Sequence, residues 1–262
     1  MLTHVFCICI NIFLIKIIKR VEAVKFLEIE FSEIIQEDLE KILYRKPLVS
    51  SIIVTPNMDF LMRYNAKVNL DFNKAIDTAD YTICDSRILK SLAALKGTRL
   101  PSVITGSDLT SSLISNPKIS NLKTLFIGPT ENEFNGLKVK YSLNNVKNIC
   151  PPFGYESDPD YIEKLFDEIV KIDPELVFIA LGSPKQEQLS LQIKNLNIKA
   201  NILCIGASLD FLSGKAKRAP LYVSKLHLEW LYRLLSEPTR MTKRYSANLK
   251  FLCKILIKRE LK

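Results

Sequence analysis

Short apolar runs alternate with amphipathic stretches along most of this chain. Runs rich in β-branched residues, such as Val49–Val54 and Leu176–Leu181, predict buried strands. The stretches between such runs carry apolar residues every three or four positions, as amphipathic helices do. Strands and helices that alternate in units of about 30 residues predict an α/β fold with a mostly parallel sheet.

The predicted elements cover the chain from residue 24 to residue 205. Further strands are predicted at Val24–Ile29, just before Asp85, and at Thr124–Ile127, Val146–Cys150 and Ile202–Ile205. Two helices are predicted to begin after a capping serine: one runs from Ser32 to Tyr44, and one from Ser107 to Ile114. A third begins after Thr130 and ends at about Ser142. The other predicted helices are Met58–Tyr64, Asn73–Thr78, Arg87–Leu95, Asp160–Lys171 and Lys185–Leu196. Glycines 128, 182 and 206 stand at strand ends, an arrangement typical of nucleotide-binding proteins.

From Ala219 onward the pattern predicts helices without strands. The chain therefore divides into an N-terminal extension (1–22), an α/β domain (23–218) and a C-terminal helical appendage (219–262). Residues 240–258 place apolar side chains at spacings of three and four, with basic side chains between them. A basic amphipathic helix is typical of a membrane-surface element, but a helix packed on its own domain has the same pattern.

The positive charge of the chain is concentrated near this appendage. Residues 215–262 carry 13 Lys and Arg against three Glu and no Asp, a net charge of +10; the whole chain is +9, so residues 1–214 carry about −1. Such asymmetry indicates a phosphate-bearing ligand, an anionic lipid surface or nucleic acid as partner, with a merely solvated helical face as the alternative. Within the basic helix predicted at residues 240–258, only Phe251 and Tyr245 could stack on bases, which disfavours nucleic acid.

The N-terminal extension contains an apolar run at 5–18 that is interrupted by Asn11 and Lys16. This run is shorter than the ~20 apolar residues of a spanning helix, and it lacks the small-residue site of a cleaved signal peptide. A peripheral anchor and an extension outside the fold are both compatible with it. The six cysteines form no CxxC pair and there are two histidines, which predicts a cytosolic chain without a zinc site or a histidine-based triad.

Three predicted strands end in polar residues that could share one crevice. Asp85 follows one strand, Thr55-Pro56-Asn57 follows another, and 182–187 follow a third. Ligands of parallel sheets bind outside the carboxyl ends of the strands, so these segments form the candidate site. Each also has an ordinary structural explanation: Asp85 as a helix N-cap, Asn57 as a stabiliser of its own turn, and Gln186 with Glu187 as exposed first-turn residues.

Several motifs of known chemistry are absent. The chain has no GxGxxG of dinucleotide dehydrogenases, no P-loop and no GxSxG nucleophile elbow. Asp158-Pro159-Asp160 has the DxD form of metal-dependent sugar transferases, but it also begins a helix, and we favour helix capping. A carboxylate can take a proton from an attacking hydroxyl, and arginines can bind a diphosphate. Asp85 and the arginines of the appendage therefore favour transfer from a nucleotide-diphosphate donor to an alcohol.

The chain also carries a set of motifs typical of one family. They are Gly182-Ser183-Pro184-Lys185-Gln186-Glu187, Gly206-Ala207-Ser208-Leu209-Asp210-Phe211, Gly214, Arg218-Ala219-Pro220, Leu228-Glu229-Trp230-Leu231-Tyr232-Arg233 and Glu237-Pro238-Thr239-Arg240. Together with Thr55-x-Asn57, Asp85 and Gly106-x-Asp108-Leu109, they make residues 24–250 resemble the WecG/TagA/CpsF glycosyltransferases, bacterial enzymes of glycosyltransferase family 26.

The resemblance implies a Rossmann-like fold with helices on both faces of the sheet. It implies a metal-independent, inverting transferase without a cofactor, which moves an N-acetylmannosamine-type sugar from a UDP-sugar donor to N-acetylglucosamine on undecaprenyl diphosphate. This reaction belongs to the synthesis of cell-surface polysaccharide or teichoic acid. The enzyme would lie on the inner face of the cytoplasmic membrane, against its anionic surface, and could form a homo-oligomer.

The resemblance also assigns roles to particular residues. Asp85 matches the general base, whereas Thr55, Asn57 and Gln186 match residues that line the sugar and phosphate pocket. Asp210 matches a position on the nucleotide side. Three arginines match those of a C-terminal appendage that closes the active site and docks on the membrane: Arg233, Arg240 and Arg244.

This sequence departs from the family pattern at three positions. Ser86 follows Asp85 where the family has glycine, Val103 stands where the family has an active-site arginine, and Lys243 replaces an arginine of the appendage. Arg87 or Arg99 could supply the missing positive charge. An alternative hypothesis is therefore a membrane-associated nucleotide-sugar-binding protein that has lost catalysis.

Overall fold

The computed structural model describes residues 21–67, 69–215, 220, 223 and 229–257. The N-terminal apolar run and Arg218 lie outside the described residues, and the connection to the appendage is described only at residues 220 and 223. Within the described ranges, no helix is both long enough and apolar enough to span a membrane.

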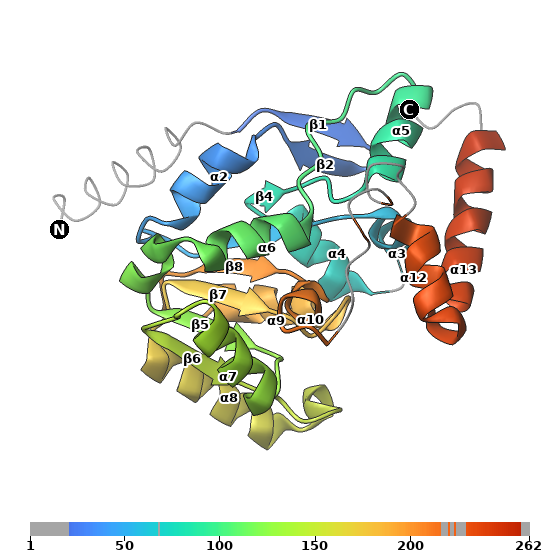
Figure 1. Cartoon of the computed structure of the whole chain (residues 1–262). Helices are drawn as coiled ribbons and strands as arrows, with labels where there is room; N and C mark the ends of the chain where they lie inside the picture. Colours follow the sequence, from blue (N-terminus) through green and yellow to red (C-terminus); the bar gives the residue numbers. More distant parts are fainter. Residues whose placement is uncertain (1–20, 68, 216–219, 221–222, 224–228, 258–262) are drawn as a thin grey trace, which may run out of the picture.

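A six-stranded sheet forms the centre of the protein (Figure 1). Its strand order is β4-β3-β8-β7-β5-β6, and every neighbouring pair is parallel. The strands are β3 (Ser51–Val54), β4 (Tyr81–Thr82), β5 (Thr124–Ile127), β6 (Val146–Ile149), β7 (Leu176–Ile179) and β8 (Asn201–Cys204). All four residues of β5, β7 and β8 are buried, as expected where helices cover both faces of a parallel sheet. The predicted α/β fold is confirmed.

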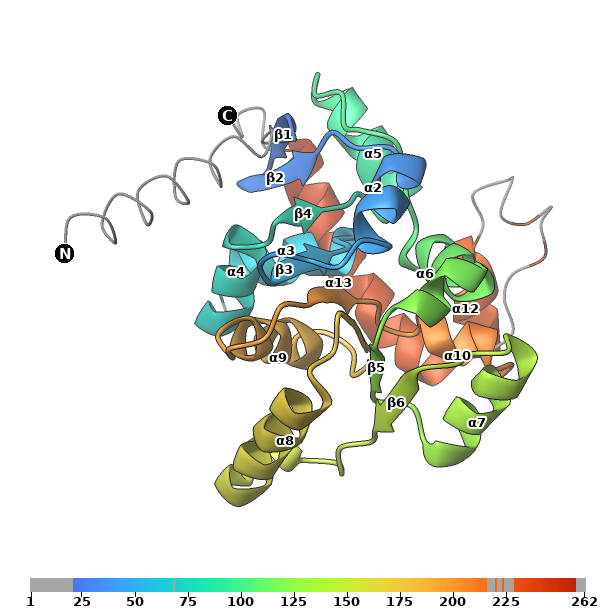
Figure 2. The ribbon, with the colours of Figure 1, turned by 90° about the vertical axis from the view of Figure 1, so that its left-hand side faces the viewer.

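Two hydrophobic clusters lie on opposite faces of this sheet. On one face, α2 (Gln36–Leu43), α6 (Gly106–Ser115), α7 (Glu131–Lys140) and α10 (Ser208–Leu212) pack around Phe126 and Phe178. On the other, α8 (Pro159–Ile172) and α9 (Lys185–Lys194) pack against Leu125 and Val177. Neighbouring residues of a strand point to opposite faces, which is why Leu125 and Phe126 belong to different clusters. Figure 2 shows α8 and α9 across the sheet from α7.

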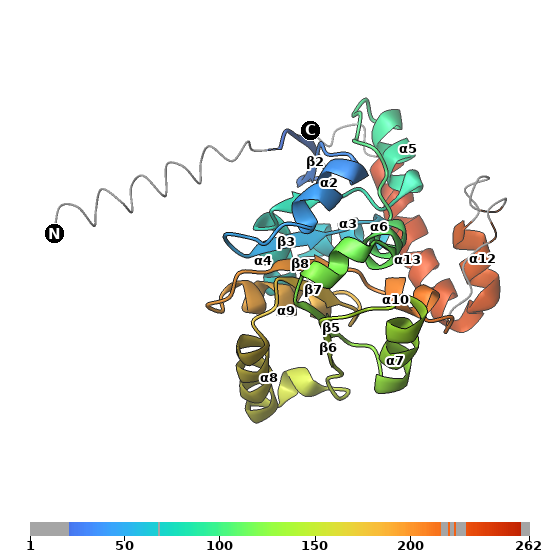
Figure 3. The same ribbon diagram turned by 60° about the vertical axis from the view of Figure 1, so that its left-hand side comes forward.

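A third hydrophobic cluster lies at the β4 edge of the sheet and includes part of the appendage. It combines side chains of an antiparallel hairpin, β1 (Ala23–Phe26) and β2 (Ile29–Ser32), with those of α3 (Met58–Ala66), α4 (Leu70–Asp77), α5 (Arg87–Leu95) and α13 (Pro238–Ile257). Segments more than 200 residues apart in the sequence therefore share one core. Figure 3 shows α12 (Glu229–Ser236) and α13 together on one side of the molecule.

The hairpin replaces a single predicted strand and the start of a predicted helix. The chain turns at Leu27 and Glu28, which have φ angles of 48° and 68°. Two successive residues with positive φ are typical of the tight hairpin turns that Asn-Gly usually forms, so Leu-Glu gives no sequence signal for one. Ser32 does not cap a helix: its hydroxyl accepts a hydrogen bond from the Thr82 amide (3.0 Å), and α2 begins only at Gln36.

The basic helix predicted at residues 240–258 is confirmed. One face of it is buried, and another presents apolar side chains to solvent. Met241 and Ile255 are each 2% exposed, so α13 packs on its own domain. Leu249 and Ile257 are 60% and 81% exposed, so another face of α13 presents apolar side chains to solvent. Removing this helix would therefore uncover part of the third cluster.

Several helix ends are explained by the side chains that cap them. The predicted helix Arg87–Leu95 is confirmed, but its N-cap is Ser86, whose hydroxyl accepts from the Leu89 amide (3.1 Å), and not Asp85. Thr105, rather than Ser107, caps α6. Asp158 caps α8 by accepting from the Tyr161 amide (3.1 Å), with Pro159 in the first turn. The capping explanation of the DxD sequence is thus confirmed.

Gly128 should tolerate no side chain at the carboxyl end of β5. Its φ is +126°, and a Cβ placed there would lie 2.8 Å from the Ala180 carbonyl oxygen. We expect Gly128→Ala to lower the free energy of unfolding by about 3 kcal/mol in urea titrations. A Cβ added at Gly136 in α7 would have no atom within 4 Å, so Gly136→Ala should raise stability by about 1 kcal/mol. Equal effects of the two changes would contradict the close approach at Gly128.

Candidate active site

The pairing of β3 with β4 continues past the strands and carries Asp85 to the carboxyl edge of the sheet. The Ile83 amide donates to the Val54 carbonyl (2.8 Å), and the Asp85 amide donates to the Pro56 carbonyl (3.1 Å). Asp85 therefore lies beside the Thr55-Pro56-Asn57 segment. The residue before Asp85 also contacts the chain that leads into α6: the Ile104 amide donates a hydrogen bond to the Cys84 carbonyl (3.0 Å), and α6 begins two residues later at Gly106.

The Asp85 carboxylate lies at the N-terminus of α6. Its Oδ1 accepts a hydrogen bond from the Gly106 amide at 3.0 Å, and Gly106 is the first residue of that ten-residue helix. The positive end of the helix dipole stabilises a negative charge at this point. Asp85 is half-buried, which suits a group that has to meet a substrate.

Gly106 is also the point where the ends of β3 and β8 come close to Asp85. A Cβ at Gly106 would lie 3.4 Å from Thr55 Oγ1 and 3.5 Å from Ser208 Oγ. Thr55 is only 7% exposed, and its hydroxyl donates to the Cys204 carbonyl at 3.4 Å. The structure thus brings Asp85 and Thr55 together, with Ser208 as a neighbour to which the sequence assigned no role.

Asn57 stabilises its own turn, as its alternative structural explanation predicted. Its Oδ1 accepts from the amides of Asp59 (3.0 Å) and Phe60 (3.4 Å), which makes it the N-cap of α3. The same residue stands next to Pro56 and so lies at the edge where Asp85 is held. Capping fixes the orientation of the Asn57 amide relative to that edge.

Gln186 and Glu187 begin α9 but are buried, so the alternative of exposed first-turn residues is wrong. Gln186 is 2% exposed and Glu187 is fully buried. Gln186 Oε1 accepts from the Gly206 amide (2.9 Å), and its Nε2 donates to Glu187 Oε1 (2.6 Å). Gln186 thereby connects the end of β7 to the end of β8, and Glu187 orients its amide.

Burial raises the pKa of Glu187 to about 7, and the Gln186 amide opposes this shift by its hydrogen bond. Burial of Cys204, with the nearby Glu187 carboxylate, raises the pKa of the Cys204 thiol. The carboxyl edge therefore contains a buried acid whose pKa is raised toward neutral pH, two residues beyond Lys185.

The appendage is attached to this edge through Asp59. The Asp59 carboxylate is buried at 4% exposure and forms an ion pair with Arg63 Nε at 2.9 Å. Its other oxygen lies 3.6 Å from Arg244 Nε of α13. Since the Asp59 amide donates the N-cap bond to Asn57, Arg244 lies within one helical turn of the candidate site.

A second contact joins the appendage to α10. The Arg233 guanidinium of α12 lies over the Phe211 ring, 4.9 Å from its centroid. Asp210, the neighbour of Phe211, is 3.6 Å from Lys215 Nζ, which also pairs with Glu133 at 2.9 Å. The predicted residues Asp210 and Arg233 thus lie on adjoining elements, at the end of β8. The backbone of Arg240 belongs to α13, and its side chain lies outside the described part of the chain.

Three residues that organise the site had no functional role assigned to them from the sequence: Asp59, Glu187 and Ser208. Asp59 and Arg63 stand four residues apart in a predicted helix, a spacing that indicates an ion pair. Glu187 and Ser208 belong to motifs that were recognised, but nothing in their local pattern indicates burial. Val103, at the position of the absent family arginine, packs against the third cluster.

The described residues contain no group of three or more side chains that could hold a metal ion. Acid, amide and arginine groups thus lie at the carboxyl edge of a parallel sheet, next to a basic appendage. The chain belongs to the glycosyl transferase WecG/TagA/CpsF family, whose model matches residues 20–262.

Two curated relatives show how closely this chain resembles proteins of known name. It is 30% identical over 197 residues to the N-acetylglucosaminyldiphosphoundecaprenol N-acetyl-beta-D-mannosaminyltransferase of Bacillus spizizenii, covering 72% of this chain and 73% of the relative. It is 28% identical over 194 residues to the protein of the same name from Bacillus subtilis, covering 73% and 74%. The chain is thus a glycosyltransferase by family.

Glu187 should make stability depend on pH. Its pKa is about 7 in the folded protein against 4.5 for an ordinary glutamate, so the folded state holds the proton more tightly. The free energy of unfolding should therefore fall as pH rises from about 4.5 to 7, by about 3 kcal/mol in all. Glu187→Gln removes this dependence.

The measurement is urea unfolding of both proteins between pH 4 and pH 8. The difference in stability between Glu187→Gln and the unaltered protein should change by about 3 kcal/mol across this range in favour of the variant. Glu163→Gln, an exposed change in α8, serves as the control and should show no such trend. A difference in stability between Glu187→Gln and the unaltered protein that stays constant from pH 4 to pH 8 would contradict a raised pKa of Glu187.

Proposed function

We propose that this protein transfers N-acetylmannosamine or a related hexosamine from a UDP-sugar to N-acetylglucosamine carried on undecaprenyl diphosphate. The observation that carries the proposal is the Asp85 carboxylate, held at the carboxyl edge by the Gly106 amide and beside Thr55. The two Bacillus relatives are named for this acceptor and this sugar. The product would enter the synthesis of a cell-surface polymer.

In the proposed reaction Asp85 acts as general base. Its carboxylate takes the proton from a hydroxyl of the acceptor sugar while that oxygen forms a bond to the anomeric carbon of the donor. The bond from this carbon to the β-phosphate oxygen breaks, and its electron pair leaves with UDP. A single displacement of this kind inverts the configuration at the anomeric carbon.

The departing UDP gains negative charge, and positive groups around the edge would stabilise it. Arg244 is placed there by Asp59, and Arg233 by Phe211. Arginine binds a diphosphate bidentately, so these residues can act without a metal ion. Asp210, close to Phe211 and paired with Lys215, would face the nucleotide side.

The exposed face of α13 supports a peripheral position on the cytoplasmic side of the membrane. Leu249 and Ile257 are exposed, and Lys250 and Lys254 are exposed beside them. Apolar side chains next to basic ones are typical of a helix that lies in the interface of an anionic bilayer. The lipid-linked acceptor would be met at that surface.

One observation favours the alternative of a sugar-nucleotide-binding protein without catalysis. Val103 occupies the position of a family arginine and packs against the third hydrophobic cluster, so that position contributes no charge. Arg87 and Arg99, which could replace it, are both exposed. Turnover assays with several UDP-sugars and a lipid-linked acceptor decide between the two functions.

Asp85→Asn should lower kcat at least about a hundredfold, because an amide cannot take the acceptor proton. UDP affinity, measured by calorimetry, should change little. The matched control is Asp160→Asn, which alters the second acid of the DxD sequence in the first turn of α8. It should leave both quantities unchanged, and EDTA should leave the rate unchanged. Turnover that survives in Asp85→Asn would remove Asp85 from the role of base.

Arg244→Gln and Asp59→Asn should each lower kcat/KM, by about tenfold or more, if their ion pair holds the appendage over the site. Because both changes break one contact, the double variant should lose little more than the worse single variant. For all four proteins of this double-mutant cycle, kcat/KM is measured with saturating acceptor and varied UDP-sugar. Losses that multiply would show that Asp59 and Arg244 act separately.

A further inference from the structure

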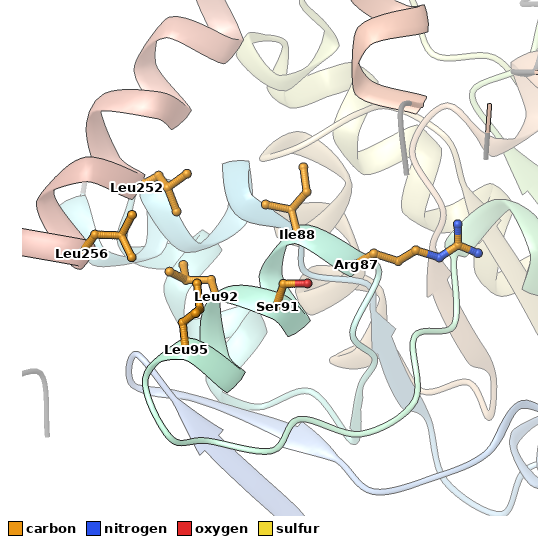
Figure 4. A pocket seen from close by; sticks show the side chains of 7 residues that line it. All are labelled: Arg87, Ile88, Ser91, Leu92, Leu95, Leu252 and Leu256. Atoms are coloured by element: carbon orange, nitrogen blue, oxygen red, sulfur yellow. The ribbon is translucent and has the colours of Figure 1, made fainter. Parts of the chain in front are cut away.

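A groove of about 220 Å³ lies between α5 of the α/β domain and α13 of the appendage (Figure 4). Its walls are Ile88, Ser91, Leu92 and Leu95 from α5, with Leu252 and Leu256 from α13. Figure 4 shows the two leucines of α13 facing those of α5. Except for Ser91 and Arg87, the residues that line the groove are apolar.

Apolar side chains remain exposed along this groove. Leu95 is 76% exposed, Leu256 is 47% exposed and Ile88 is 40% exposed. Single exposed apolar residues are ordinary on a protein surface, but a gathering of them around a concave feature indicates a binding site. The lining favours an apolar occupant, and Leu92 on the wall from α5 belongs to the same hydrophobic cluster as Ile255 of α13.

The groove begins close to Asp85. Arg87, which also lines it, is two residues beyond Asp85, and its guanidinium points away from the leucines in Figure 4. From Arg87 the helix rises 1.5 Å per residue, so Leu95 lies about 12 Å further along. An acid, a cation and an apolar channel thus follow one another from the sheet edge outward.

We propose that this groove binds the first isoprene units of a polyprenyl chain whose diphosphate lies at Arg87 and whose sugar reaches Asp85. The inference rests on the proposed function, because that function supplies an acceptor made of a sugar, a diphosphate and a polyprenyl chain in this order. The order of chemistry along α5 is the same. The groove needs both walls, so the appendage would complete the acceptor site as well as hold the donor.

The test uses two synthetic acceptors that need no membrane. Both carry N-acetylglucosamine diphosphate; one is linked to geranyl, which has two isoprene units, and the other to methyl. Without vesicles or detergent, the unaltered protein should show kcat/KM for the geranyl acceptor about tenfold or more above that for the methyl acceptor, because burial of a few methylene-sized groups is worth at least that factor.

Ser91→Trp fills the groove from an exposed position, and Ala94→Trp adds the same side chain to an exposed position of α5 that does not line it. Ser91→Trp should remove the preference for geranyl while the rate with the methyl acceptor stays within about twofold. Ala94→Trp should keep the preference. Circular dichroism and the midpoint of thermal unfolding check that both variants fold.

Leu256→Lys, on the other wall, gives an independent reading if Ser91→Trp is unstable, and it should also remove the preference. If the unaltered protein uses both short acceptors equally, or if Ser91→Trp and Leu256→Lys keep the preference, the groove does not hold the chain. Failure of the proposed function looks different: the unaltered protein would then transfer no sugar even to the undecaprenyl acceptor in vesicles.

Discussion

The hydrogen bond from the Gly106 amide to the Asp85 carboxylate is the contact on which the site depends. It joins the chain after β4 to the first residue of α6, and Gly106 in turn lies against Thr55 and Ser208 at the ends of β3 and β8. A Cβ at position 106 would lie at ordinary contact distance from both hydroxyls. The Gly106 amide thus donates to the Asp85 carboxylate at a point where three strand ends approach it, and the helix dipole supports the charge of that carboxylate.

The appendage is part of the same core as the α/β domain, which limits how it can move. Ile255 and Met241 are buried, whereas Arg244 and Arg233 contact α3 and α10 at the carboxyl edge. Ile255 belongs to the third hydrophobic cluster and so fixes the C-terminal part of α13 close to the side chains of the β1–β2 hairpin. The contacts of Arg244 and Arg233 bring two positive charges to the carboxyl edge, where the proposed reaction would release UDP. Packing and electrostatics thus act on different faces of the appendage.

The parts of the fold that depend on burial could be predicted from the sequence. Leu176–Ile179 and Thr124–Ile127 are buried on both faces of the sheet, and their short apolar runs before Gly182 and Gly128 predicted this. Position 85 could be placed because parallel strands bring their carboxyl ends to one edge. The hairpin turn at Leu27 and Glu28 could not, since neither residue type favours positive φ. Nor could the burial of Gln186 and Glu187, because the Gln186 side chain is held by the Gly206 amide, which follows β8 and is 20 residues away in the sequence.

Burial of the Glu187 carboxyl group lowers the stability of the protein, but it also fixes the orientation of the Gln186 amide. A carboxyl group with a pKa of about 7 is partly protonated at neutral pH. Whether Glu187 is ionised or protonated, its Oε1 can accept the hydrogen bond from Gln186 Nε2. Gln186 Oε1 is already occupied by the Gly206 amide, so the two bonds together fix the orientation of the Gln186 side chain. An apolar residue at position 187 would remove the cost of burying an acid, but it would leave the Gln186 amide without its partner. The protein thus gives up some stability at neutral pH and gains an amide of fixed direction between β7 and β8, the strands whose ends flank the proposed sugar and nucleotide positions.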